Sequence, residues 1–212
     1  MPNPKQETPA ILEKIHALYE KSKEKARGRV PPEQFLTTPF PVLHAGSVPT
    51  NLTEANYDLD VYGEVENPVT LKFKDIQTKF PKTNIVEDIH CVTHWTKLDM
   101  PWAGVKFSDL MKLVKPTKKA NFVIFEAEEG WTTNLPMEDC MKDNVLIAYE
   151  YEAKPITSQH GGPVRMVVPH KYFWKSAKWL RKIRLVEKDE PGFWEVRGYN
   201  TPADPWKNER YS

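Results

Sequence analysis

The stretch EDIHCVTHW (residues 87–95) contains Cys91, one of only two cysteines in the chain, with histidines before and after it. Residues 84–92, NIVEDIHCV, have the apolar and β-branched composition of a strand that runs into this cysteine. Four fates are open to the thiol: a reduced core residue, part of a zinc site, a nucleophile, or a ligand of a softer metal.

A zinc site is suggested by His90, Cys91 and His94, which fall within five residues. Structural zinc draws four ligands from paired motifs, and the sequence offers no second pair to complement this one. On a strand, moreover, His90 and Cys91 point to opposite faces and cannot easily share one ion. The spacing therefore argues against zinc.

A nucleophilic cysteine needs a base held against the thiol, which His160 or His170 could supply from elsewhere in the chain. No local signature of a cysteine hydrolase surrounds Cys91. A buried reduced thiol is the commonest fate of a cysteine, and this stretch taken alone favours it.

The composition limits the classes of protein to which this chain can belong. A chain of 212 residues is long enough for one sizeable core, and 30 Lys or Arg against 29 Asp or Glu leave a net charge of +1. Such a balance gives no global field for nucleic acid or an anionic membrane, so no nucleic-acid partner is expected. No window approaches the roughly 20 apolar residues of a membrane span.

The compartment is predicted from the cysteines and from the first 30 residues. Two cysteines 49 positions apart suggest reduced intracellular thiols, although a Cys91–Cys140 bridge remains a minor alternative. The first 30 residues hold seven Lys or Arg and four Glu, with no apolar run like that of a secretory signal. These features predict a cytoplasmic protein.

The hydrophobic pattern predicts an α+β fold: a strand-rich mixed sheet with short helices and no regular βαβ alternation. Residues 1–35 are predicted to form an N-terminal helix, starting at Thr8 and Pro9, and a charged linker; residues 36–212 form the main domain. Strands are predicted at 57–61, 69–73, 84–92, 120–128, 144–151 and 164–169, and short helices at 74–80 and 108–114.

Charge is distributed unevenly. Residues 126–152 hold eight Asp or Glu and one Lys, whereas residues 171–188 hold seven Lys or Arg and one Glu. Aromatic residues alternate with the basic ones, which is also typical of nucleic-acid binding. Because the chain is neutral overall, we favour a compact pocket for a single phosphate.

Several segments taken together decide between the alternatives for Cys91. They are FPVLHAGSVP, IHCVTHW, PWAGVKFSDLM, HGGPVRMVVPHKYFWKSAKWLRKIRLVEKDEPGFWEVRGYN and DPWKNERY. The chain thereby resembles, from about residue 40 to residue 211, the single-domain molybdopterin-dependent oxidoreductases of the sulfite oxidase superfamily. The resemblance implies the molybdopterin-domain fold of that superfamily, with a barrel-like core.

By the same resemblance, Cys91 is the catalytic thiolate ligand of molybdenum, within a C-x3-W motif that is followed by Trp102 and Gly104. A soft sulfur donor suits a metal whose reduction potential has to be tuned. The resemblance assigns the pterin and its phosphate to His160, Arg165, Ser176, Ala177 and Lys178, and more weakly to His44. Gly161 and Gly162 would let the backbone approach the pterin.

The chain also departs from its relatives. Periplasmic members carry a threonine where Ala127 stands, so one cofactor hydrogen bond is absent or replaced. Animal and plant sulfite oxidases follow the cysteine with an arginine-rich run, but here the run is VTHW, which argues against sulfite as substrate. His90, His94 and Trp95 are left as candidates for lining the substrate pocket.

The expected function is two-electron redox chemistry with Mo-molybdopterin, through oxygen-atom transfer to or from a small S-oxide, N-oxide or oxyanion. No haem domain is expected, because the resemblance takes up nearly the whole chain, so an external electron carrier is required. The alternative is a non-catalytic binding module that keeps the fold. The intact Cys91 and phosphate-end segment argue against that alternative.

Overall fold

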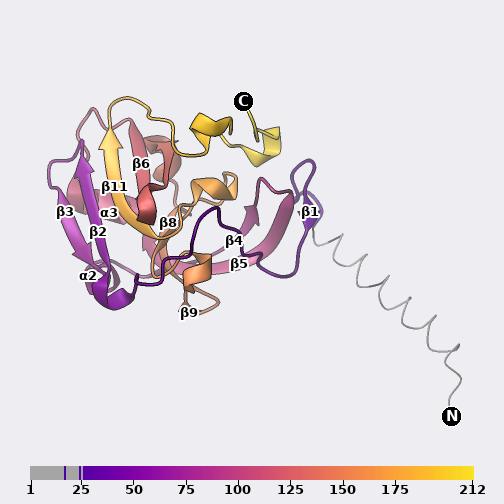
Figure 1. Cartoon of the computed structure of the whole chain (residues 1–212), viewed down its shortest axis with the longest axis horizontal. Helices are drawn as coiled ribbons and strands as arrows, with labels where there is room; N and C mark the ends of the chain where they lie inside the picture. Colours follow the sequence, from indigo (N-terminus) through magenta and orange to yellow (C-terminus); the bar gives the residue numbers. More distant parts are fainter. Residues whose placement is uncertain (1–16, 18–23, 25) are drawn as a thin grey trace, which may run out of the picture.

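The computed structural model describes residues 17, 24 and 26–212 and shows two β-sheets with short helices (Figure 1). The helix predicted from Thr8 lies outside the described residues. The first sheet contains β1 (Phe35–Leu36), β4 (Thr83–His90), β5 (Trp95–Lys106), β8 (Leu146–Tyr151), β9 (Lys154–Pro155) and β10 (Arg165–Val167). The second contains β2 (Asp58–Gly63), β3 (Val69–Lys72), β6 (Phe122–Ala127), β7 (Thr132–Pro136) and β11 (Leu180–Val186). The α-helices of this part are α2 (Phe73–Lys79), α3 (Phe107–Val114) and α4 (Met137–Cys140).

The long strand β5 organises the first sheet, in which the order is β1-β5-β8-β10 and β4 also pairs with β5. β4 and β5 are antiparallel and joined by a tight turn at residues 91–94, so Cys91 follows the last residue of β4. Gly104 lies where β5 meets β8, and a Cβ there would stand 2.2 Å from the Ile147 carbonyl oxygen. Glycine is required at this position by the close approach of the two backbones.

The second sheet has the order β3-β2-β11-β6-β7, with β11 parallel to β2 and antiparallel to β6. One hydrophobic core joins the two sheets, because Val105 and Ile147 of the first cluster with Leu59, Val61 and Phe125 of the second. The predicted α+β class and mixed pairing are confirmed. The barrel-like core is not, because within the described residues neither sheet closes on itself and β3 and β7 are open edges.

The predicted elements are present with small shifts in their ends, but five strands went unpredicted: β1, β5, β7, β9 and β11. Pro101 interrupts the pattern of β5, and a proline inside a run argues against a strand. The sequence of β11 was interpreted as a basic cluster rather than as a strand. Its apolar residues are buried in the core while its basic ones remain outside.

The basic and acidic clusters partly neutralise each other across the β11–β6 pair. Arg184 lies 3.2 Å from Glu126 and 2.6 Å from Glu190, and Arg181 lies 3.3 Å from Glu128. The prediction that the basic residues 171–188 form one phosphate pocket is therefore too broad. Among them, only Lys178 lines the cavity described below.

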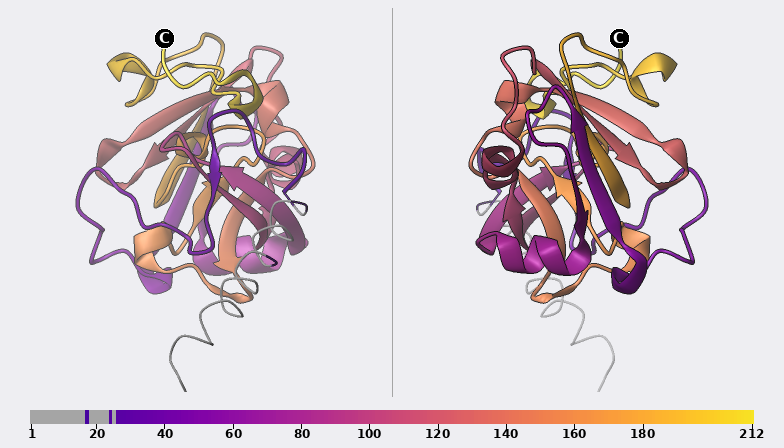
Figure 2. Two further views of the ribbon diagram at one scale, coloured as in Figure 1. Left: turned by 90° about the vertical axis from the view of Figure 1, so that its right-hand side faces the viewer. Right: turned by 90° about the vertical axis from the view of Figure 1, so that its left-hand side faces the viewer.

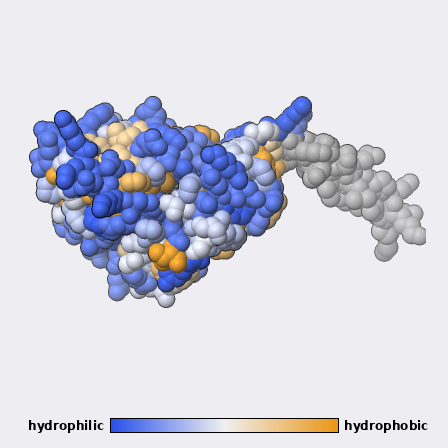
Figure 3. All heavy atoms as spheres, turned by 90° about the horizontal axis from the view of Figure 1, so that it is seen from above, coloured by the Kyte–Doolittle hydropathy of each residue, from blue (hydrophilic) through white to orange (hydrophobic). Residues whose placement is uncertain are grey.

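No helix in the described part of the chain has the length and apolarity needed to cross a membrane. Seen from above, the surface is mainly hydrophilic with small hydrophobic patches (Figure 3). The C-terminal segment crosses the top of the molecule in Figure 1, and two side views show it above both sheets (Figure 2). This segment carries aromatic residues that reach the candidate site.

Candidate functional site

A cavity of about 330 Å³ lies between the 91–94 turn, the loop at residues 40–46, β7 and the C-terminal segment. Its volume is within the range of small-molecule and cofactor sites. The side chains that matter for its chemistry are His44, Cys91, Thr93, Trp95, Arg165, Ser176, Ala177 and Lys178. An aromatic wall completes it, consisting of Trp131, Trp174, Trp194 and Tyr199.

The 91–94 turn positions Cys91 at this cavity. The Cys91 amide donates to the Trp95 carbonyl at 2.9 Å, and the His94 amide donates back to the Cys91 carbonyl at 3.1 Å. His94 adopts a φ of 70°, the left-handed conformation that closes the turn. The Gln34 amide group also donates to the Cys91 carbonyl at 3.0 Å. The thiol is thus held at a fixed place on the cavity wall, only 8% exposed.

The sulfur of Cys91 has its own hydrogen-bond partner. Thr93 donates from Oγ1 to the sulfur at 3.2 Å. Burial raises the pKa of the Cys91 thiol, and the Thr93 hydroxyl and the backbone amides of Thr93 and Val92 oppose that rise. Arg210 supports the same turn by donating to the Val92 carbonyl at 2.7 Å.

The other fates considered for Cys91 find no support. Cys91 and Cys140 are both free and buried, so they form no bridge. No group of three His, Cys, Asp or Glu side chains able to hold a metal occurs in residues 26–212 or at positions 17 and 24. Neither histidine considered as a base lines the cavity: the ring of His160 stacks on Phe40 with centroids 3.9 Å apart, and His170 contacts Asp139 at 3.1 Å.

Only Trp95 of the three residues expected to line the substrate pocket does so. His90 is buried on the other side of the strand, where its Nδ1 lies 2.9 Å from the Thr96 hydroxyl. Burial lowers the pKa of His90 to about 4, so this ring is neutral at pH 7. His94 is exposed and its Nδ1 lies 2.9 Å from the Glu33 carbonyl oxygen. The structure places both histidines outside the cavity.

Arg165 is a buried cation without a carboxylate partner among the described residues. It is 1% exposed, and its guanidinium donates to the carbonyls of His160 at 2.6 Å and Ser176 at 2.9 Å. The guanidinium also lies 4.3 Å from the ring centroid of Phe173. Burial alone lowers the pKa of Arg165 to about 9. Its charge at the cavity is therefore uncompensated and favours an anion.

Lys178 brings a second cation to the same cavity. Its Nζ donates to the carbonyls of Leu43 and Gln159, both at 2.7 Å. Burial and then the charge of Arg165 lower the pKa of Lys178 to about 7. Among the described residues, no Asp or Glu lines the cavity. Two cations and no acid make it a site for an anionic group.

Ser176 and Ala177, which the resemblance assigned to the pterin end, also line the cavity. The Ser176 hydroxyl accepts from the Val168 amide at 2.9 Å, and the Ala177 carbonyl accepts from the Met166 amide at 2.8 Å. Both residues are fixed by β10 and the residues that follow it.

The two remaining candidates for the pterin end are histidines. His44 is exposed at the rim, where its Nδ1 lies 2.8 Å from the Gly46 carbonyl oxygen. His160 does not line the cavity but contributes the carbonyl that holds Arg165. Burial, Arg165 and Lys178 lower the pKa of His160 to about 4.

The two glycines expected to make room for the pterin make room for the chain itself. A Cβ on Gly161 would stand 2.7 Å from the Cβ of Lys178, and the φ of Gly161 is +98°. A Cβ on Gly162 would stand 1.9 Å from the Ile156 carbonyl oxygen. Gly161 therefore allows Lys178 to approach the turn that contains His160, and Gly162 allows the backbone of Ile156 to approach it.

The aromatic wall is the part of the site that the sequence did not predict. Tyr199 packs on Trp174 with centroids 5.0 Å apart and on Trp194 at 4.9 Å. Trp174 in turn donates to the buried carboxylate of Glu195 at 2.9 Å. The run of aromatic residues after position 190 was a signal for it, but the sequence does not show where that run folds.

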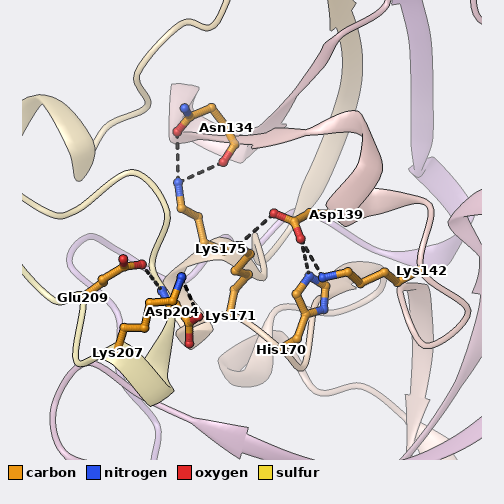
Figure 4. Close-up of polar contacts among 9 residues, drawn as sticks. All are labelled: Asn134, Asp139, Lys142, His170, Lys171, Lys175, Asp204, Lys207 and Glu209. Atoms are coloured by element: carbon orange, nitrogen blue, oxygen red, sulfur yellow. Dashed lines mark hydrogen bonds and ion pairs between the residues drawn. The ribbon is translucent and has the colours of Figure 1, made fainter.

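Behind this wall lies a buried ion pair. Lys175 is 2.6 Å from Glu195, with side-chain exposures of 0% and 1%. Lys175 also donates to both oxygens of Asn134, as drawn in Figure 4. The pair holds the C-terminal segment against β7 and so positions the wall.

The residues present fit a cofactor with a soft metal at one end and a phosphate at the other. Cys91 offers a sulfur ligand, and Arg165 and Lys178 offer the positive charge. The buried indole nitrogen of Trp95 has no hydrogen-bond partner among the described residues, so it remains available to an acceptor.

Comparisons with known proteins agree with this chemistry. The family model described as oxidoreductase molybdopterin binding domain matches residues 45–194. The uncharacterized oxidoreductase YuiH of Bacillus subtilis (strain 168) is 48% identical over 185 residues, which cover 87% of this chain and 93% of the relative. The catalytic subunit MsrP of protein-methionine-sulfoxide reductase from Campylobacter jejuni is 31% identical over 168 residues, covering 71% of this chain and 56% of the relative.

A solved structure shows the same fold. The sulfane dehydrogenase SoxCD from Paracoccus pantotrophus superposes with a TM-score of 0.61 at 23% identity, covering 70% of this chain and 42% of that chain. The chain thus spans about half the length of MsrP and of the SoxCD chain. The comparisons and the fold together show that this chain belongs to the oxidoreductase molybdopterin-binding domain family, as a Mo-molybdopterin oxidoreductase of the sulfite oxidase superfamily.

Proposed function

We propose that Cys91 ligates the molybdenum of the cofactor in this cavity, and that the protein transfers an oxygen atom to or from a small S-oxide, N-oxide or oxyanion. The observation that supports this most strongly is the donor set: one thiol, two cations without carboxylate partners among the described residues, and no acidic side chain in the lining. The methionine-sulfoxide reductase activity in the name of the Campylobacter relative favours S-oxides within this group.

When bound, the cofactor supplies a metal centre that exchanges two electrons and an oxygen atom with the substrate. The protein holds the cofactor and encloses the substrate. Lys178 and Arg165 neutralise the phosphate, and the turn at residues 91–94 fixes the sulfur ligand. The aromatic wall removes water from the substrate side of the cavity and strengthens these electrostatic contacts.

The overall reaction in the reducing direction converts an S-oxide, two electrons and two protons into a thioether and water. The electrons have to come from outside the cavity, so we propose an external electron-transfer partner. We also propose that the protein works in the cytoplasm, which two buried, unpaired cysteines support.

Metal and pterin analysis of the purified holoprotein tests the proposal, together with turnover of an S-oxide and N-oxide panel with reduced viologen as electron donor. We expect about one molybdenum and one pterin per chain and turnover of at least one S-oxide. Stoichiometric zinc without pterin, or a colourless protein that fails reconstitution, would instead favour a non-catalytic binding module.

The affinity for phosphate is expected to fall as pH rises above about 7, because Lys178 has to be charged to hold it. Burial holds the pKa of free Lys178 at about 7, and a bound phosphate raises it, so binding takes up a proton above pH 7. The apparent affinity should then fall by at most about tenfold per pH unit. Calorimetric titration of the cofactor-free protein with phenyl phosphate, a dianion above about pH 6, measures this fall.

The matched control is Lys178→Arg, because arginine keeps its charge throughout the range. This variant should show no fall between about pH 7 and 8, one unit below the pKa of about 9 of Arg165. The same slope in both proteins would mean that another group accounts for it.

A further inference from the structure

The turn at residues 91–94 surrounds the Cys91 sulfur with hydrogen-bond donors. The Thr93 hydroxyl lies 3.2 Å from the sulfur, and the backbone amides of Val92 and Thr93 point toward it. A thiolate bound to a metal has no proton, so it can only accept. The Thr93 hydroxyl is therefore the donor in the loaded protein.

Thr93 has no evident role other than this contact. Its side chain lines the cavity and is exposed, and its hydroxyl has no other hydrogen-bond partner in the part of the chain that the structure describes. The turn itself is held by the backbone bonds between Cys91, His94 and Trp95 and by Arg210 on the Val92 carbonyl. Removing the hydroxyl should leave that framework in place.

We infer that Thr93 raises the reduction potential of the metal bound to Cys91, by donating a hydrogen bond to the ligating sulfur. This inference rests on the proposed role of Cys91 as the metal ligand. Reduction leaves more negative charge on the metal and its sulfur, so a donor to that sulfur stabilises the reduced state more than the oxidised one. Thr93 is thus a positioning and tuning residue, not one that reacts.

The side chain of Thr93 is suited to this role for a geometric reason. It lies two residues after Cys91 within the same turn, so its hydroxyl can reach the sulfur without crossing the cavity. Valine has the same shape without the hydroxyl, and serine keeps the hydroxyl without the methyl group. These two replacements separate the hydrogen bond from the packing.

The experiment compares holoprotein of wild type, Thr93→Val, Thr93→Ala and Thr93→Ser, titrated with dithionite and followed by the Mo(V) electron paramagnetic resonance signal. Both variants without a hydroxyl should have lower potentials, by about a threefold to tenfold change in the reduction equilibrium, or roughly 30 to 60 mV for one electron. Thr93→Ser should stay at the wild-type value. The sulfur-to-metal absorption band should move to longer wavelength in Thr93→Val and Thr93→Ala only.

Cys91→Ser, prepared in parallel, tests the role of Cys91 as metal ligand separately from the tuning role of Thr93. If it binds molybdenum and titrates like wild type, the ligand assignment fails. If it loses the metal or its absorption band while Thr93→Val and Thr93→Ala keep the wild-type potential, only the tuning role of Thr93 is overturned. A shift in Thr93→Ser as large as that in Thr93→Val would also overturn it, because packing would then explain both.

Discussion

Replacing Cys91 with serine is expected to abolish oxidoreductase activity while leaving the fold intact. Loss of a hydrogen-bond partner of a metal ligand already lowers metal affinity or activity about 10- to 100-fold. Loss of the ligand itself should lower them further. Serine is a harder donor and cannot match the electron donation of sulfur. The measurements are turnover of an S-oxide, the molybdenum content and the circular dichroism spectrum.

The matched control is the other cysteine. Cys140 is fully buried in the main core and does not line the cavity, so Cys140→Ala should keep its molybdenum and its turnover. It should lose only about 1 kcal/mol of the free energy of unfolding, a usual effect of a small core change. Full activity in Cys91→Ser would contradict the assignment of the ligand.

Replacing Lys175 with methionine is expected to give the largest loss of stability, about 3–5 kcal/mol, because it leaves a buried carboxylate without its cation. Glu195 is the uncompensated partner, 2.6 Å away and 1% exposed. Burial lowers the pKa of Lys175, and the charge of Glu195 opposes that change. Urea denaturation of the cofactor-free protein measures the loss. The aromatic wall should loosen as well, because Trp174 donates to the same carboxylate.

An exposed pair is the control for this effect. Lys106 lies 2.8 Å from Asp143, but their side chains are 31% and 93% exposed, so Lys106→Met should have almost no effect on the free energy of unfolding. In a double-mutant cycle, Glu195→Gln added to Lys175→Met should recover part of the loss. Equal losses in Lys175→Met and Lys106→Met would show that burial adds nothing to the pair.

Local patterns sufficed for the class of the fold and for most of its elements. Alternation of apolar residues predicted β2 and β3, because residues on one face of a strand share one environment. Short apolar and β-branched runs predicted β4, β6, β8 and β10. Pro101 interrupts the strand pattern of β5, and three basic residues interrupt that of β11, so neither strand was predicted. The local pattern also does not reveal which strands pair with each other. The pairing of β11 with β6 settles where those charges go.

The candidate site was also predicted only in part from the sequence. The sequence by itself predicted the chemical types at the cavity, because Cys91, Arg165 and Lys178 all lie in the motifs that carry the resemblance. The sequence predicted that His90 and Cys91 point to opposite faces of a strand, but only the tertiary structure shows which face lies at the cavity. His90 follows the alternation of β4 away from the cavity, and His94 turns outward at a left-handed residue.

The aromatic wall and the Thr93 contact also belong to the tertiary structure. Trp131, Trp174, Trp194 and Tyr199 are spread over 69 positions of the sequence, and no local pattern brings them together. A buried ion pair between residues 20 positions apart sets their arrangement. The local sequence specifies which secondary structure a segment can form. Only long-range packing specifies which segments come together in the aromatic wall of the cavity.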